Sequence, residues 1–144
     1  MELLKMPPGD NRCLLYSASM ILGVKPTDLA LSVGCSGLEP IWDSFPNNRG
    51  HHVQEIVFAA LALGWAAIYF ELQPELVKGS QRIDLRSDAA LRALKQFPAV
   101  LLSDTHAVAW DTQMIYDPKG RIYPIDLRSF QAGLLFLKSE NQFS

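Results

Sequence analysis

Residues 13–22 read CLLYSASMIL, a segment of the 144-residue chain that is apolar or small on every face of a helix. Such a helix has to be surrounded by the rest of its domain, because none of its sides favours contact with water. Asp10-Asn11 supplies residues typical of a helix N-cap, and Gly23 supplies the usual stop at the C-terminal end. We therefore predict a buried helix over residues 13–22 at the centre of the protein.

Outward from this helix, the chain predicts helices first and short antiparallel strands afterwards. Turn residues and apolar periodicity predict further helices at Pro26 to about Val33, His52–Leu63 and Asp88–Gln96. They predict strands at Trp65–Leu72, Ala99–Ser103, His106–Trp110, Gln113–Tyr116 and Gly133–Leu137, and loops at 34–50 and 73–82. This order is typical of an α+β fold, and the length fits a single domain spanning residues 1–144.

One apolar run, Ile56–Phe70, carries no charge over its whole length. A membrane-spanning helix needs about 20 apolar residues, whereas this run is shorter, is bracketed by Glu55 and Glu71, and is divided by Gly64. We therefore predict a buried helix followed by a buried strand, and no membrane partner.

Composition and charge exclude several classes of protein. Apolar residues make up 49% of the chain and charged residues 19%, which is too apolar for a disordered protein. The formal net charge of -2 leaves no positive footprint for a nucleic acid. Two cysteines cannot build a disulfide scaffold, and the first residues do not form a signal-peptide pattern. We therefore expect a cytoplasmic globular protein, whose oligomeric state stays open.

Cys13 is the first candidate for chemistry, because it opens the buried helix directly after a Pro-Gly-Asp-Asn-Arg loop. The free amides and the dipole at a helix N-terminus favour a thiolate, and we expect them to lower the pKa of the thiol. The same amides are suited to binding an oxyanion. The alternative interpretation is that Cys13 is a small apolar residue at the start of a helix.

His106 is the second candidate, because the chain after it turns at Asp111-Thr112 and returns through Asp117. If that turn has two residues, Trp110 faces Gln113 and His106 lies directly opposite Asp117. Facing residues on one side of a hairpin have Cβ atoms roughly 5 Å apart. Asp117 would then fix the imidazole of His106, and a nearby cysteine would complete a Cys-His-Asp set. The alternative is a partly buried histidine at a sheet edge.

The two motifs together resemble a known family. The segment from Asp10 to Gly23, DNRCLLYSASMILG, resembles the nucleophile helix of papain-like cysteine peptidases, closest to small bacterial and phage proteins akin to the bacteriocin leader-processing (double-glycine) peptidases. His106-Ala-Val-Ala-Trp-Asp111, with Ile115-Tyr-Asp117-Pro118, looks like the His-to-Asp-Pro hairpin of that family. The resemblance implies a central N-terminal helix packed on an antiparallel sheet and a peptide or protein substrate. It implies no cofactor.

The sequence departs from this family at the predicted oxyanion site. Members usually carry a Gln several residues before the Cys, whose amide helps to bind the oxyanion, whereas here Asn11 is the candidate donor. Many members also have Gly directly after the Cys, and this chain has Leu14. Because one oxyanion donor is typically worth about a hundred- to thousandfold in rate, these departures affect the expected activity more than the expected fold.

Other candidate residues carry weaker signals. Cys35 lies in a Gly-Cys-Ser-Gly loop with no helix after it, and we interpret it as a small loop residue. His51 and His52 suggest either substrate contacts or, with a cysteine, a metal site, but the Cys-x-x-Cys spacing of a zinc site is absent. Trp42 and Arg49 are further substrate-binding candidates. We expect no metal and assign His51, His52 and Trp42 to substrate binding.

Three functions remain open at the level of sequence. The first is a cysteine peptidase or related thiol hydrolase that uses Cys13, His106 and Asp117, although acyl transfer would use the same groups. The second is a catalytically weak or inactive papain-like scaffold that binds a protein, for example a phage-encoded inhibitor of a host factor. The third is a metal-binding regulatory domain that uses His51, His52 and a cysteine.

Overall fold

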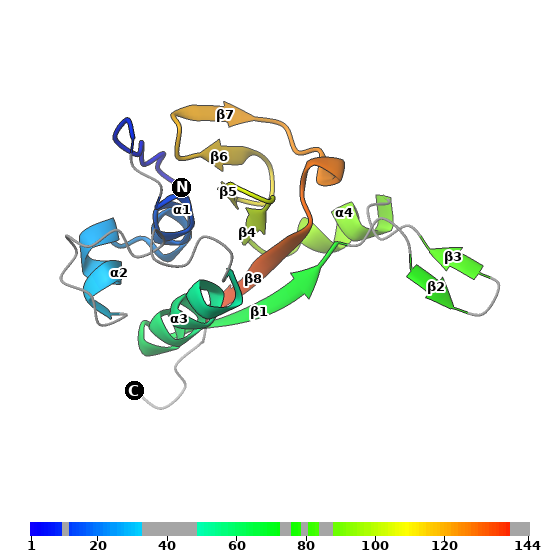
Figure 1. Cartoon of the computed structure of the whole chain (residues 1–144), viewed down its shortest axis with the longest axis horizontal. Helices are drawn as coiled ribbons and strands as arrows, with labels where there is room; N and C mark the ends of the chain where they lie inside the picture. The colour runs from blue at the N-terminus through cyan, green and yellow to red at the C-terminus, as the bar shows by residue number, and fades with distance from the viewer. Residues whose placement is uncertain (10–11, 33–48, 73–75, 79–80, 84–87, 139–144) are drawn as a thin grey trace.

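The structure is a computed structural model that describes residues 1–9, 12–32, 49–72, 76–78, 81–83 and 88–138 (Figure 1). The side chains of residues 49–52, 76–78, 81–83 and 88–90 lie outside this description. The helices are α1 (Cys13–Leu22), α2 (Pro26–Ser32), α3 (Arg49–Ala62), α4 (Asp88–Leu94) and the 3-10 helix η1 (Leu127–Ser129). The strands are β1 (Trp65–Glu71), β2 (Leu76–Lys78), β3 (Gln81–Ile83), β4 (Ala99–Leu102), β5 (Ala107–Trp110), β6 (Ile115–Asp117), β7 (Arg121–Tyr123) and β8 (Ala132–Lys138).

Six of the strands form one antiparallel sheet in the order β1-β8-β4-β5-β6-β7, and β2 pairs with β3 in a separate hairpin. The mixed α+β class expected from the sequence is therefore confirmed at the level of helices and an antiparallel sheet. The hairpin of β2 and β3 corrects the expected loop at 73–82, and β7 and η1 were not predicted. These elements are three residues long, which is too short for a clear periodicity in the sequence.

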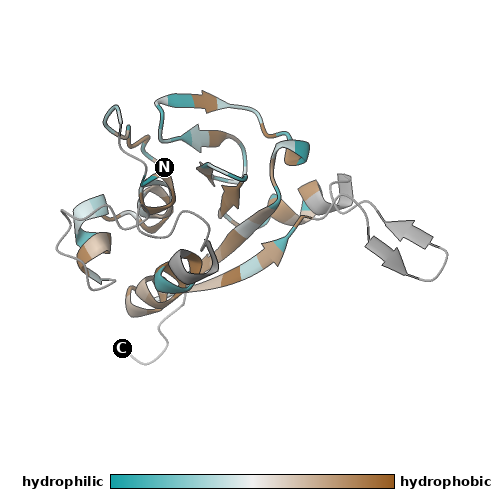
Figure 2. Cartoon of the chain, in the orientation of Figure 1, coloured by the Kyte–Doolittle hydropathy of each residue, from teal (hydrophilic) through white to brown (hydrophobic). Residues whose placement is uncertain are grey.

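The sheet is covered on both faces, as the alternation of side chains along β4 shows. Val100 and Leu102 join a core cluster with α1, α2 and α3, whereas Ala99 and Leu101 join a second cluster with α4 and η1. Hydrophobic residues gather on the elements around these clusters, and the β7 end of the sheet is more hydrophilic (Figure 2). Because β4 and β5 are buried on both faces, they form the rigid centre of the molecule.

Helix α1 lies where the sequence predicts it, against β4 and β5 (Figure 1). Eight of its ten residues are buried, and Gly23 ends it in the left-handed conformation at φ 71°. The N-cap position is occupied by Arg12, whereas we expected Asp10-Asn11 to cap the helix. Residues 10 and 11 themselves lie outside the described part of the chain.

The apolar run at 56–70 divides at Gly64, as expected, with α3 before it and β1 after it. The prediction that both elements are buried is wrong in part: Phe58 and Leu61 of α3 and Ile68 of β1 are exposed. Helix α3 packs on the face of β1 that carries Trp65 and Ala67, and Ile68 lies on the opposite face. Within the described ranges, none of the helices has both the length and the apolar character that a bilayer crossing requires.

The central position of α1 leads to a test with two leucines in helices. Leu15 of α1 has 0% of its surface exposed, whereas Leu61 of α3 is 55% exposed. Leu15→Ala leaves a cavity between helix and sheet and should lower the free energy of unfolding by about 2–5 kcal/mol. Leu61→Ala should change it by about 0.5 kcal/mol or less. Urea unfolding measures both, and equal losses would contradict a central α1.

Candidate active site

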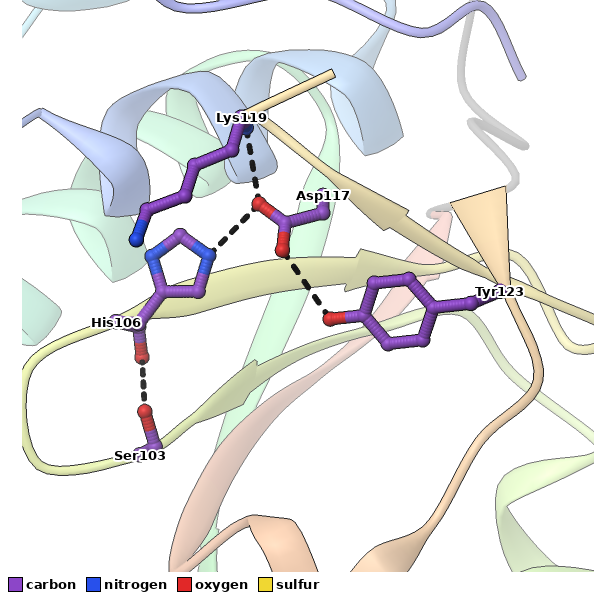
Figure 3. Close-up of polar contacts among 5 residues, drawn as sticks. All are labelled: Ser103, His106, Asp117, Lys119 and Tyr123. Atoms are coloured by element: carbon purple, nitrogen blue, oxygen red, sulfur yellow. Dashed lines mark hydrogen bonds and ion pairs between the residues drawn. The ribbon is translucent and has the colours of Figure 1, made fainter. Parts of the chain in front are cut away.

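His106 occupies the entrance of β5, where a tight turn fixes its backbone. The backbone N–H and the hydroxyl of Ser103 both donate to the carbonyl oxygen of His106, at 2.9 and 3.2 Å (Figure 3). The next residue, Ala107, begins the strand and is buried. The imidazole therefore projects from the rim of the sheet, with its side chain 21% exposed.

Asp117 ends β6 and starts the turn that leads into β7. The backbone N–H of Gly120 donates to the carbonyl oxygen of Asp117 at 2.8 Å, and Gly120 has φ +106°, a conformation that favours glycine. Inside the turn, the N–H of Lys119 donates to Oδ1 of Asp117 at 2.9 Å. The turn thus holds the carboxyl group in place. The residue as a whole is buried, with only 3% of its surface exposed.

The side chains of His106 and Asp117 point toward one another, with Nε2 of the imidazole 2.7 Å from Oδ1 of the carboxylate (Figure 3). An ionised carboxylate only accepts hydrogen bonds, so Nε2 carries the proton in this contact. The sequence predicted these two residues on one side of the hairpin within hydrogen-bond reach, and that prediction is confirmed. Their catalytic role stays a prediction.

The register that led to this prediction was wrong. Trp110 pairs with Ile115, not with Gln113, because the loop has four residues instead of two. Asp111 holds this longer loop: its Oδ1 accepts from the backbone N–H groups of Gln113 and Met114, at 2.8 and 2.7 Å. The shift amounts to two residues, and two is the period of side chains along a strand. Asp117 therefore stays on the His106 side, and the pair meets diagonally instead of directly.

Cys13 is partly buried at the first position of α1, which packs against β5. Its thiol faces three backbone amides, those of Ala107, of Leu14 and of Cys13 itself. Because Ala107 follows His106 in the chain, the structure brings Cys13 to the strand end that carries the imidazole. The thiol of Cys13 therefore lies near the start of β5, directly after the residue that bonds to Asp117.

The protonation state of Cys13 differs from the expectation. Burial raises the pKa of the thiol, and the negative charge of Asp117 raises it further, whereas the three amides lower it. The helix N-terminus was expected to dominate and to lower this pKa. Burial wins because the all-apolar helix that places Cys13 also removes water from it. The raised pKa favours the neutral thiol over the thiolate.

Tyr123 is a member of the site that the sequence analysis missed. Its hydroxyl donates to Oδ2 of Asp117 at 3.2 Å, and burial together with the charge of Asp117 raises the pKa of Tyr123 to about 12. The guanidinium of Arg121 lies 5.6 Å from the centre of the Tyr123 ring. The Pro118-Lys119-Gly120 stretch is a turn signal, and recognising a hairpin there would have placed Tyr123 near Asp117.

The side chains of the other candidate residues lie outside the described part of the structure. Asn11, Trp42 and Cys35 lie outside the described part of the chain. His51 and His52 belong to the first turn of α3, and their side chains are outside the description. Within the described ranges, no group of three or more His, Cys, Asp or Glu side chains is arranged to hold a metal ion.

The buried carboxylate leads to a stability test. Asp117→Asn places an amide N–H₂ among three donors, so at least one of these part-buried donors loses its acceptor. Each such loss costs about 1–3 kcal/mol, and we expect the free energy of unfolding to fall by about that amount. The control is Asp104→Asn. Asp104 is exposed on the turn before His106, so its substitution should leave the free energy of unfolding almost unchanged. Equal effects in urea unfolding would contradict the role of Asp117 as a shared acceptor.

Comparisons with known proteins do not assign the chain to a group. No protein family matches the sequence, and no curated protein matches it significantly. The geometry of Cys13, His106 and Asp117 is therefore the basis on which a function is proposed.

Proposed function

We propose that the chain is a papain-like thiol hydrolase that cleaves an amide or peptide bond. The observation that carries this proposal is the 2.7 Å contact between Nε2 of His106 and Oδ1 of Asp117, at the strand end whose next amide, that of Ala107, faces the thiol of Cys13. A nucleophile, a base within its reach and a group that orients the base are the three parts of covalent acyl-transfer catalysis. The resemblance noted in the sequence supports the same assignment.

The proton in this reaction moves through Nδ1 of His106, because Asp117 accepts the proton on Nε2. Nδ1 takes the thiol proton while the sulfur of Cys13 bonds to the carbonyl carbon of the substrate. The imidazolium then returns that proton to the amide nitrogen as the C–N bond breaks and the amine leaves. Water hydrolyses the resulting thioester, its proton passing through the same nitrogen, and the free thiol is restored.

The raised pKa of Cys13 changes the expected order of events. A standing thiolate–imidazolium pair, which the sequence suggested, is disfavoured by the burial of the thiol. Proton transfer to His106 instead accompanies the attack on the substrate, as in general-base catalysis, which contributes about 10²–10⁴-fold in rate. The backbone N–H of Cys13 is one candidate donor to the oxyanion, and Asn11 remains the predicted second donor.

A second candidate function is a protein-binding module built on the same scaffold. The raised pKa of Cys13 favours it, because a neutral thiol is a poor nucleophile. The absence of the upstream Gln in the sequence favours it as well. Against it stands the part-buried contact between His106 and Asp117, since a binding surface has no need of an oriented imidazole. The two functions differ in whether Cys13 forms a covalent intermediate.

Hydrolysis of a mixture of fluorogenic peptide amides tests the proposal. Cys13→Ala should abolish cleavage, and His106→Gln should reduce it about 10²–10⁴-fold, because Gln cannot carry the proton. Cys35→Ser replaces the other cysteine of the chain and should leave the rate unchanged. Mass spectrometry of the intact protein should detect an acyl adduct on Cys13. Cleavage that survives Cys13→Ala would refute the proposal, and a wild type without cleavage or adduct would favour the binding module.

The pH dependence of alkylation tests the state of the thiol. With iodoacetamide, the rate at Cys13 should rise with pH and reach half its maximum above about 8.5, the ordinary pKa of a cysteine, because burial raises this pKa. The charge of Asp117 also raises it, so Asp117→Asn should move the Cys13 midpoint downward. Peptide-level mass spectrometry follows Cys13 and Cys35 separately, and the Cys35 midpoint should stay unchanged. A Cys13 midpoint well below 8.5 in the wild type would contradict this assignment.

A further inference from the structure

Asp117 lies on β6, the middle one of three paired strands, and meets one donor directly before β5 and another on β7. The pairing of β6 with β7 places Asp117 opposite Arg121, so Tyr123 is two residues away along β7. The register between β5 and β6, extended by one pair, places Val108 opposite Asp117, and His106 lies two residues before Val108, directly ahead of β5. Diagonal neighbours at this offset are within reach of long side chains. Tyr123 and His106 thus approach the carboxylate from the two sides of β6. Tyr123 lies diagonally toward the start of β6, and His106 lies diagonally toward its end.

The two carboxylate oxygens have different partners. Oδ1 accepts from Nε2 of His106 at 2.7 Å and from the N–H of Lys119 at 2.9 Å. Oδ2 accepts from the hydroxyl of Tyr123 at 3.2 Å (Figure 3). A carboxylate held at one oxygen can still rotate about its bond to Cβ, and such terminal torsions are broad. A donor at the second oxygen restricts that rotation and keeps Oδ1 aimed at His106.

We infer that Tyr123 is a positioning residue, whose hydroxyl holds Asp117 in the orientation that keeps the proton of neutral His106 on Nε2 and leaves Nδ1 as the base. This inference rests on the proposed function, because the tautomer of His106 matters for catalysis only if Nδ1 accepts the proton of Cys13. Tyr123 touches neither the thiol nor the imidazole in the contacts described. It acts through Asp117.

The chemical state of the tyrosine fits this role. Burial and the charge of Asp117 raise the pKa of Tyr123 to about 12, and the nearby charge of Arg121 opposes that rise only in part. The hydroxyl therefore keeps its proton, and stays a donor, at neutral and mildly alkaline pH. The ring packs against the second core cluster, so its position does not depend on the hydrogen bond alone.

Tyr123→Phe separates the hydroxyl from the ring, because Phe keeps the packing and loses only the donor. The matched control is Tyr116→Phe: Tyr116 precedes Asp117 on β6 and packs on the other core cluster, and its hydroxyl interacts with Asp111. The readout is the 15N spectrum of imidazole-labelled protein at a pH where His106 is neutral, since the two ring nitrogens report the tautomer. A merely structural role for the hydroxyl would not move this signal.

In the wild type and in Tyr116→Phe, the Nε2–H tautomer of His106 should dominate. In Tyr123→Phe its share should fall, and the Nε2 proton should exchange faster with water. An unchanged tautomer and exchange rate in folded Tyr123→Phe would overturn the inference, whatever the thiol does. A fall of the same size in Tyr116→Phe would also overturn it, because the effect would then not depend on contact with Asp117.

Alkylation of Cys13 at pH 7 distinguishes this inference from the proposed function. If both hold, Tyr123→Phe should slow it about two- to tenfold, the value of one ordinary hydrogen bond. In an Asp117→Ala background the same substitution should have no further effect, since the two residues act as one unit. A changed tautomer with unchanged alkylation would support the positioning role and refute the proposed part of His106 in activating the thiol.

Discussion

The buried carboxylate of Asp117 is the group on which the arrangement of the site depends. A charge that is 3% exposed is costly unless hydrogen bonds replace its water. Here the donors come from three successive pieces of chain: His106 before β5, Lys119 in the turn after β6, and Tyr123 on β7. Each donor fixes one strand or turn relative to the next. The need to satisfy one carboxylate thus links the β5–β6–β7 end of the sheet into a single unit.

The N-terminal segment connects this unit to the helix that carries the thiol. The backbone N–H of Met6 donates to the carbonyl oxygen of Pro118 at 2.6 Å, next to Asp117. The stem of Lys5 passes over Gly120, where an added Cβ would lie 3.2 Å from its Cδ. A few residues later the chain enters α1 at Cys13. The start of the chain therefore fastens the turn of Asp117 close to the helix of the candidate nucleophile.

Burial has two opposing effects on the candidate nucleophile. The all-apolar surface of α1 places Cys13 against β5, where the amide of Ala107 reaches the thiol. The same burial raises the pKa of the thiol and disfavours the thiolate. Burial thus positions the thiol and at the same time makes it less reactive. In the proposed reaction, His106 compensates for this by accepting the thiol proton, and Asp117 and Tyr123 orient its imidazole.

Features that depend on local sequence pattern could be predicted before the fold was known. The composition of residues 13–22 required a central helix, Gly64 divided the apolar run, and the period of two along a strand kept His106 and Asp117 on one side even though the loop length was misjudged. Tertiary structure decided the rest. The diagonal contact depends on a loop that Asp111 holds with its own side chain, the short strand β7 has too few residues to show a period, and the protonation of Cys13 depends on how much water the packed helix excludes. Each of these features depends on contacts that form only when the chain is folded, so a local sequence pattern does not reveal them.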